Sequence, residues 1–308
     1  MADAVLEPSQ QLLRRSDAIG LAHLFGHLTL LAATGGTVVA LSTSSMWWWP
    51  LGWCATAVHG LALSHLYMPF HESTHGTAFE SPVLCQTVAW LLGVLIFMNA
   101  DSFRFFHREH HEYTQVAGRD PELPGANGAL RNYLHKLLGG EMATALWHFC
   151  TSAIVGEAGE GPWVPKSARR GVVASIRWQC ACYVLSVALS IASTGFRWAL
   201  VTLWLWPLAL AQPSLWGHFI LQHTATDTDG DPRHTARVVI THPAYEWLSW
   251  GMNYHAVHHM NPRIPFHHLP SAFAASPHLF KHVERRGYLV AHADMLANRV
   301  WKLLQQQQ

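Results

Sequence analysis

The stretch His107-Arg108-Glu109-His110-His111 has the pattern HxxHH, and His255-Ala256-Val257-His258-His259 repeats that pattern far downstream. A shorter pattern, HxxxH, occurs at His71-Glu72-Ser73-Thr74-His75. In chain order these are boxes one (71–75), two (107–111) and three (255–259). Residues three and four positions apart share one face of a helix, so each box directs two or three imidazoles toward one point. We therefore expect a helical fold that brings the three boxes together.

The boxes, together with a histidine that follows the last apolar stretch, supply nine candidate metal ligands. These are His71, His75, His107, His110, His111, His223, His255, His258 and His259. Zinc takes three or four protein ligands, so nine imidazoles are too many for one ion. The count predicts two ions with four or five nitrogens each. Imidazole suits Fe, Cu, Zn and Ni alike, so the count leaves the metal open.

Apolar stretches flank the boxes and are long enough to enter a membrane. Four of them predict transmembrane helices of about 20 residues, the length that crosses a ~30 Å hydrocarbon layer. They are Leu21–Leu41, a stretch from the aromatic anchor Met46–Pro50 to about Phe70, Ile176–Ser193, and Trp198–Trp216. A fifth, Pro82–Ala100, lies between boxes one and two. Because those two boxes must meet at one centre, we expect this fifth stretch not to cross.

Composition agrees with a membrane protein. Half of the 308 residues are hydrophobic and 13% are charged, against roughly a quarter charged in soluble domains. This balance argues against a soluble enzyme and excludes a disordered chain. With 20 Lys and Arg against 19 Asp and Glu, there is no net field to attract nucleic acid. The fifteen Trp suit aromatic side chains at membrane interfaces.

The distribution of basic residues predicts the orientation. When the N-terminus, residues 101–177 and everything after His218 lie on one side, so does every Lys and Arg except Arg197. Cytoplasmic segments are enriched in Lys and Arg, which makes that side cytoplasmic. The polar first 20 residues do not read as a secretory signal.

The predicted fold is an all-α integral membrane protein with four transmembrane helices and a cytoplasmic helical cap that carries the metal site. It forms one domain over residues 1–308, with polar tails at 1–20 and 300–308. An interfacial helix is expected at Leu130–Cys150.

The five cysteines have no CxxC pair and sit in apolar sequence. We predict that Cys54, Cys85, Cys150, Cys180 and Cys182 are small buried hydrophobes in a reducing compartment. Four further histidines lie within apolar stretches and without box spacing. These are predicted to be core or pocket-lining residues: His23, His27, His59 and His65.

The three boxes resemble those of the membrane fatty acid desaturase family, which also includes hydroxylases and carotenoid ketolases. The most specific similarity, to bacterial members, lies in Gln222-His223-Thr224, in 250–259 and in 261–270. It extends over roughly Gly60 to Pro270. Carried over residue by residue, the resemblance makes the nine histidines the ligands of two iron ions. It also implies O2 as co-substrate and an external ferredoxin, rubredoxin or cytochrome b5-type electron donor with its reductase.

The implied activity is oxidation of a C–H bond in a hydrophobic, lipid or fatty-acyl-like substrate. Desaturation is the expected outcome, and hydroxylation or carotenoid-type ketolation on the same scaffold are the alternatives. A divalent-metal transporter is the alternative from another class, but transporters hold ions near the midplane on broken helices. Here the boxes lie at the ends of apolar stretches, which favours the enzyme. The lack of a GxGxxG, P-loop or flavin motif agrees with an external electron donor.

Some members of the family add a tenth ligand one turn before the histidine that matches His223. That position is Phe219 here, which cannot ligate. His218 is the nearest substitute, although residues five positions apart, such as His218 and His223, do not lie on the same face of a helix.

Residues in and beside the boxes are candidates to support the ligands, because the second nitrogen of a ligating histidine needs an acceptor. The candidate carboxylates are Glu72, Asp101, Glu109 and Asp227. His267 and His268, in a Pro-rich loop, are expected to support the ligands or lie at the surface.

Overall fold

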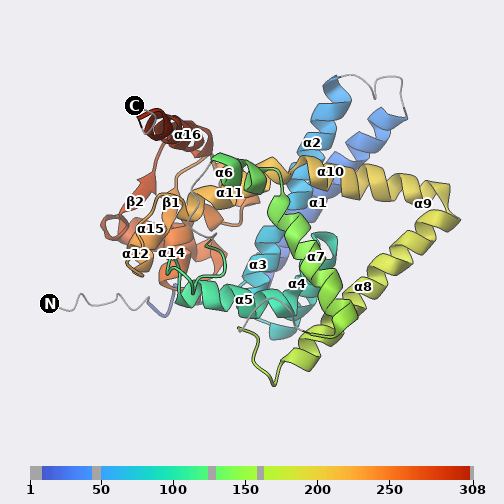
Figure 1. The fold of residues 1–308 in the computed structure, drawn as a ribbon, viewed down its shortest axis with the longest axis horizontal. Helices are drawn as coiled ribbons and strands as arrows, with labels where there is room; N and C mark the ends of the chain where they lie inside the picture. The colour runs from blue at the N-terminus through green and yellow to red at the C-terminus, as the bar shows by residue number, and fades with distance from the viewer. Residues whose placement is uncertain (1–8, 44–49, 124–129, 158–162, 306–308) are drawn as a thin grey trace.

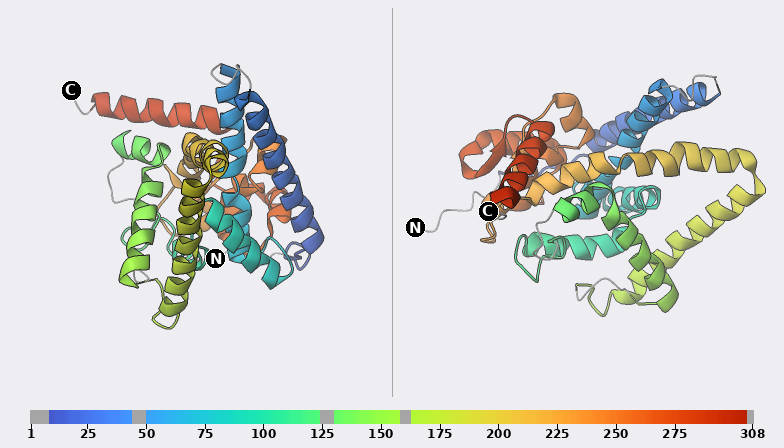
Figure 2. Two further views of the ribbon diagram at one scale, coloured as in Figure 1. Left: turned by 90° about the vertical axis from the view of Figure 1, so that its right-hand side faces the viewer. Right: turned by 45° about the horizontal axis from the view of Figure 1, so that its top comes forward.

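The computed structural model describes residues 9–43, 50–123, 130–157 and 163–305. It consists mainly of helices (Figure 1). Two helical arms extend from a body that contains the boxes. One arm pairs α1 (Asp17–Ser42) with α2 (Pro50–Ser64). The other pairs α8 (Arg169–Ala192) with a chain of shorter helices, and Figure 2 shows both arms from two further directions.

Two helices in the described residues are long and apolar enough to cross a membrane: α1, with 26 residues, and α8, with 24. At 1.5 Å per residue α1 is about 39 Å long, which exceeds the ~30 Å hydrocarbon layer. Large apolar side chains on α8 point outward, with Trp178 71% and Ile191 77% exposed. Such a surface suits lipid and is costly in water.

The other two predicted spans differ from the expectation. The second helix, α2, ends at Ser64, and a separate helix, α3 (Tyr67–His75), carries box one. The predicted span Trp198–Trp216 is divided among four successive segments: α9 (Thr194–Ala199), the π-helix η2 (Leu200–Leu205), α10 (Trp206–Leu210) and α11 (Gln212–His223). Prolines at the starts of α10 and α11 remove helical hydrogen-bond donors there. The predicted aromatic anchor falls largely on residues 44–49, outside the described part of the chain.

The apolar stretch between boxes one and two bends instead of continuing straight. Helix α4 (Pro82–Leu95) and helix α5 (Ala100–Glu112) meet at an angle of 100°. At the bend Phe97 has φ +60°, and the Asn99 side chain caps α5 by accepting from the Ser102 N–H. The amide of Asn99 also donates to Ser175 and Gln179 of α8, both at 3.1 Å. The bend lets α5 return box two to box one.

The predicted interfacial helix Leu130–Cys150 is two helices, α6 (Leu130–Leu137) and α7 (Gly140–Val155). They part at Gly139, whose φ of +79° is open to glycine without strain. The sequence prediction of one continuous helix was wrong because apolar periodicity does not reveal a residue with left-handed backbone conformation.

The chain after His223 folds into short elements around box three. The helical segments are α12 (Pro232–Thr235), α13 (Pro243–Leu248), η3 (Met252–Tyr254), α14 (His255–Met260), η4 (Phe266–His268), α15 (Leu269–Ala275), η5 (Pro277–Leu279) and α16 (Tyr288–Gln305). Strands β1 (Arg237–Val239) and β2 (His282–Glu284) pair in parallel. The all-α prediction missed this sheet because three-residue strands are too short to show alternation.

The main core joins the body to the base of the first arm. Its fully buried members include Leu66, Phe70, Phe79, Trp250 and Leu269. The core therefore spans α3, the loop that follows it and the segments around box three, and it holds boxes one and three against each other.

The prediction that all five cysteines are buried was wrong for most of them. Cys85 is buried, whereas Cys54 and Cys150 are exposed and Cys180 and Cys182 are intermediate. All five are free thiols. The sequence context is apolar because the helices are, and an apolar helix exposes one face to its surroundings.

Candidate metal centre

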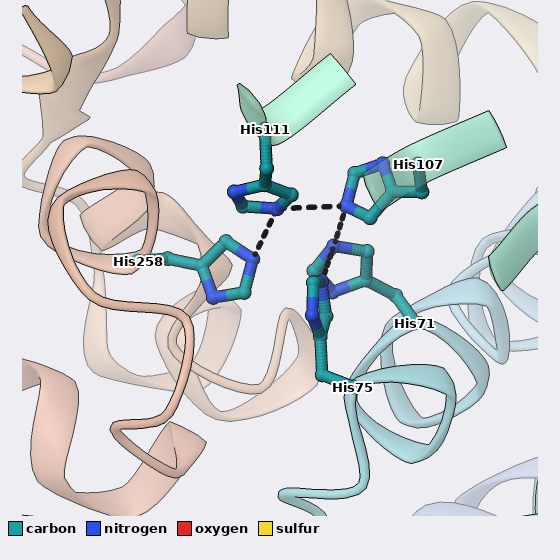
Figure 3. Close-up of side chains that lie close together, drawn as sticks. All are labelled: His71, His75, His107, His111 and His258. Atoms are coloured by element: carbon teal, nitrogen blue, oxygen red, sulfur yellow. Dashed lines mark hydrogen bonds between the residues drawn. The ribbon is translucent and has the colours of Figure 1, made fainter. Parts of the chain in front are cut away.

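Five predicted ligands form one group of converging imidazoles (Figure 3). Box one on α3, box two on α5 and one residue of α14 supply the ring nitrogens, which all lie within 4.8 Å of one another: His71, His75, His107, His111 and His258. Three segments far apart in sequence thus point their side chains into one space. We call this set the five-nitrogen group.

The remaining four predicted ligands form a second group with the same spacing limit of 4.8 Å. It consists of His110, His223, His255 and His259, and we call it the four-nitrogen group. The structure therefore brings all nine predicted residues together and divides them into five and four. His110 and His111 are neighbours in sequence, yet they face different groups.

The contacts between these imidazoles fit metal ligation. Nε2 of His71 lies 2.7 Å from Nε2 of His107, and Nε2 of His111 lies 3.1 Å from Nε2 of His258. Two nitrogens bound at about 2.0–2.1 Å to one ion stand about 2.9–3.4 Å apart. In the four-nitrogen group, Nε2 of His223 lies 2.8 Å from Nε2 of His255.

Buried ring nitrogens without hydrogen bonds also fit a bound cation. In the described residues, Nε2 of His110 and Nε2 of His259 are buried and have no hydrogen-bond partner. Buried polar atoms are normally paired, so such exceptions require an explanation. A donor set of neutral imidazoles suits iron among other metals. The residues present therefore fit two metal ions.

The outward-facing nitrogens of several group members have acceptors of their own. Nδ1 of His110 donates to Asp120 at 2.8 Å, and Nδ1 of His107 donates to Glu122 at 3.1 Å. Nδ1 of His223 donates to the Thr235 carbonyl at 2.9 Å. These bonds fix the tautomer that leaves Nε2 without a proton and free to ligate.

Burial keeps most of the nine imidazoles neutral. It lowers the pKa of His75 to about 3 and that of His223 to about 4. Burial and the neighbouring imidazoles hold the pKa of His258 well below its usual range. Burial also lowers the pKa of His110, but the carboxylates of Glu122 and Asp120 outweigh it and leave that pKa raised. Neutral imidazole is the form that binds metal.

Asp120 and Glu122 were missed from the sequence, and three of the four predicted carboxylates do not contact the groups. Asp101 pairs with Arg104 at 3.3 Å, Glu109 lies 3.6 Å from Arg119, and Asp227 pairs with Lys281.

Glu72 is the predicted carboxylate that does reach a group. It is fully buried, with an oxygen 4.0 Å from Nδ1 of His258. Burial raises its pKa to about 7, against the opposing hydrogen bonds from Thr77 and the Phe266 N–H.

The histidines predicted to be core residues lie outside both groups. Nε2 of His27 donates to the Ala62 carbonyl at 2.8 Å, and Nε2 of His59 donates to the Leu203 carbonyl at 3.0 Å. His23 likewise donates to the Trp247 carbonyl at 2.8 Å. The hydrogen bonds of His27 and His59 connect neighbouring helices, and that of His23 connects α1 to the body of the protein.

His218 is also outside the groups. Its Nε2 accepts from the Gln222 amide at 2.9 Å, and its Nδ1 lies 3.2 Å from the Tyr245 hydroxyl. The same hydroxyl contacts Nε2 of His65 at 3.1 Å. The rings of His267 and His268 are tilted against each other, with centroids 4.3 Å apart, in the segment after box three.

A cavity of about 710 Å³ opens beside both groups. His71 and His107 of the five-nitrogen group line it, as do His110, His223 and His255 of the four-nitrogen group. Most of the remaining wall is apolar, from the α4–α5 bend, α7 and α11. Representative residues are Ile96, Phe103, Phe149, Leu215 and Phe219. A mainly apolar pocket with a few convergent polar groups is the usual form of a small-molecule site.

The fatty acid desaturase family profile matches residues 46–286, which contain all nine histidines and the cavity. The chain belongs to the fatty acid desaturase family. It is similar to the sphingolipid delta(4)-desaturase/C4-monooxygenase DES2 of Mus musculus, with 25% identity over 250 residues, 77% of this chain and 69% of the relative. It is also similar to DES2 of Homo sapiens, with 24% identity over 259 residues and the same coverage.

Proposed function

We propose that this member of the desaturase family is a membrane-bound diiron oxidoreductase that uses O2 to oxidise a C–H bond of a lipid. The observation that carries the proposal is the division of nine imidazoles, six buried and three partly buried, into the five- and four-nitrogen groups beside one mainly apolar cavity. Two iron ions, when bound, would activate O2 for the oxidation of an unactivated C–H bond. The names of the similar proteins support desaturation or hydroxylation of a lipid.

The chain's own residues hold the two ions and direct the substrate. The nine Nε2 atoms are the proposed ligands, and the bonds from His107, His110 and His223 to their acceptors keep those Nε2 atoms deprotonated. Phe103 and Phe149 present apolar surface to a hydrocarbon chain in the cavity. An apolar, water-poor wall also protects an oxidising site from side reactions.

Desaturation is the proposed outcome, with hydroxylation or ketolation as alternatives on the same scaffold. Product analysis by mass spectrometry tests the proposal, after expression in a host that supplies a ferredoxin, rubredoxin or cytochrome b5-type donor with its reductase. A lipid lacking two hydrogens supports desaturation, and a lipid that has gained one oxygen supports hydroxylation. Purified protein that holds one zinc and no iron would contradict the diiron proposal.

A divalent-metal transporter makes the opposite prediction about the ions. In the enzyme the iron pair is expected to stay bound during turnover, because mostly buried ligands from four helices surround it. Rapid exchange of labelled iron across a vesicle membrane, with no oxidised lipid, would favour the transporter.

We further propose a single domain, residues 1–308, with four membrane crossings and with the N-terminus, the metal centre and the C-terminus in the cytoplasm. The α4–α5 bend supports this topology, since boxes one and two face one space. Cysteines placed at Glu80 and Ser102 should both react with a thiol reagent from the cytoplasmic side only. Labelling from opposite faces would refute the topology.

A further inference from the structure

Helix α7 has the cavity on one side and the outside of the protein on the other. On one face, residues three and four positions apart line the cavity: Met142, Ala145, Phe149 and Ser152. The opposite face carries a row of exposed apolar residues at the same spacing: Ala143, Trp147, Cys150 and Ile154. We call this row the outer stripe of α7.

The outer stripe is strongly exposed for apolar side chains. Trp147 is 68% exposed and Ile154 is 81% exposed, and Leu138 at the end of α6 adds a further exposed side chain. Such patches mark contact with a membrane or with another protein. The outer stripe is therefore a contact surface.

The packing of α7 against α8 favours the bilayer as the partner of this surface. The helix runs from α6 to the first turns of α8 (Figure 1), which is long and apolar enough to cross a membrane. Phe149 and Ile176 share one apolar cluster between the two helices. Arg177 of α8 donates to the Ala153 carbonyl at 3.0 Å, and the next residue, Trp178, is exposed. An arginine beside an exposed tryptophan is typical of a membrane interface, so α7 lies at that depth.

The ends of α7 are held by other helices, whereas its middle spans the cavity. The C-terminal half packs on α8, and Gly139 joins the N-terminal end to α6. There the Tyr133 hydroxyl lies 3.2 Å from Nδ1 of His292 on α16. Within the described part of the chain, the side chains of residues 142–148 form no hydrogen bond to another helix.

Thr144 and His148 mark the mouth of the cavity. They lie one turn apart, and both are exposed although they also line the cavity. With 3.6 residues per turn, their positions fall between the outer stripe and the cavity face. The mouth therefore borders the surface that faces the bilayer.

Hydrogen-bond donors lie at this mouth, whereas much of the buried wall is apolar. In the described residues Lys136 is the one Lys or Arg that lines the cavity, and it is partly exposed. Lys136 and His148 both offer N–H donors. Phe103 and Leu215 line the cavity and are buried. This division fits a molecule with an oxygen-bearing head and a hydrocarbon chain.

On the basis of the proposed lipid oxidation, we propose that the lipid substrate enters the cavity directly from the bilayer, past the Thr144–His148 edge of α7. The hydrocarbon chain enters first and reaches the histidine groups. The head stays at the mouth, where Lys136 donates to a head-group oxygen. The chain thus passes from the bilayer to the cavity without exposure to water, which would be costly.

The first test closes the mouth. A long-chain fatty acid with a diazirine near its methyl end is added to the full chain in phosphatidylcholine vesicles, and mass spectrometry locates the label after illumination. In the wild type we expect label on cavity residues such as Phe103. Ala145→Trp should lose this label, whereas the matched variant Ala143→Trp, on the outer stripe, should keep it. Equal cavity labelling of the two variants would overturn the route.

A second variant introduces the bulk after folding, because a tryptophan at position 145 also strains the packing of α7. Ala145→Cys combined with Cys150→Ala is folded, treated with a bulky maleimide and then photolabelled. The treatment should abolish the cavity label, and the Cys150→Ala chain treated in the same way controls for the other cysteines. Undiminished label after complete reaction would contradict the proposal.

The natural Cys150 tests the orientation of the outer stripe. In vesicles, a chain that retains Cys150 alone should react with a membrane-soluble maleimide and not with a charged thiol reagent. The same chain with its single cysteine moved to the exposed position of Lys166 should react with both. Equal reaction of the two positions with the charged reagent would place the outer stripe in water and refute the inference.

Lys136→Met tests the position of the head. It should weaken binding of the fatty acid about 10-fold, the effect of losing one hydrogen bond from a charged group, and Lys166→Met should not. Equal binding of both variants would remove the head from Lys136. Cavity labelling that follows these expectations in a protein without iron or oxidised product would overturn the proposed function and leave the route standing.

Discussion

The histidines of the α1–α2 arm and the histidines of the boxes differ in the hydrogen-bond partners of their ring nitrogens. His27 and His59 each donate a ring N–H to a backbone carbonyl of another helix. His71 and His258 instead place Nε2 against the Nε2 atoms of other histidines. A nitrogen that donates to a carbonyl carries a proton and is not available to a metal, whereas clustered nitrogens gain a partner when an ion binds. The partner of the ring nitrogen, more than burial, separates the two roles.

The largest expected effect is the loss of a box histidine at the centre of a group. His258→Ala or His110→Ala should leave fewer than two irons per chain and abolish lipid oxidation, because an ion loses a ligand that no neighbour can replace. Metal analysis of purified protein measures the first effect and product analysis the second. Retention of two irons in both variants would show that the nitrogen clusters are not the metal site.

The second prediction compares two histidines on α11. His223→Ala should lose iron because Nε2 of His223 belongs to the four-nitrogen group. His218→Ala should keep both irons, since its nitrogens contact Gln222 and Tyr245. If His218→Ala loses iron and His223→Ala does not, the assignment of ligands on this helix is wrong.

The third prediction concerns a histidine of the arm. His59→Leu removes hydrogen bonds to Thr34 of α1 and to Leu203 of η2. Side-chain hydrogen bonds between membrane helices contribute about 0.6–2 kcal/mol each, so the melting temperature in detergent should fall while the iron content stays at the wild-type level. A drop in iron at unchanged stability would place His59 with the boxes.

The smallest expected effect is a pH dependence outside the groups. Burial and the neighbouring His268 lower the pKa of His267 from its ordinary 6.5 to about 4. Between these values the unfolded chain binds a proton that the folded chain does not, so His267 lowers stability as the pH falls from about 6.5 to 4. His267→Gln should flatten the pH dependence of the melting temperature over this interval. An unchanged slope would mean that His267 titrates normally.

The spacing within each box predicted that the imidazoles would converge, and their number predicted sets of four or five nitrogens, but neither predicted which residue joins which set. In boxes two and three the first and last histidines share a group and the middle one faces the other group, although positions i, i+3 and i+4 lie on one helix face. The resemblance of residues 222–224 also favours His223 over His218 as a ligand, and the structure places His223 in the four-nitrogen group and His218 against Gln222 and Tyr245.

Asp120 and Glu122 could not be predicted in the same way. They lie in a loop after α5 that reverses and returns to the helix, so no periodicity connects them to box two. The weak signal available was an acidic pair around Pro121, directly after a histidine box. The glycine break between α6 and α7 and the three-residue strands likewise depend on tertiary contacts that a single sequence does not reveal.

The α4–α5 bend has a consequence for the order in which the protein matures. The amide of Gln179 donates to the Gly93 and Met98 carbonyls beside the bend, and Asn99 donates back to Gln179. Residue 179 leaves the ribosome long after box two, and box three follows later still. A nascent chain that has emerged only as far as α7 therefore lacks the contacts that secure the turn and four of the nine imidazoles, those of His223, His255, His258 and His259. If the centre binds iron as proposed, a complete set of ligands exists only after box three has been synthesised.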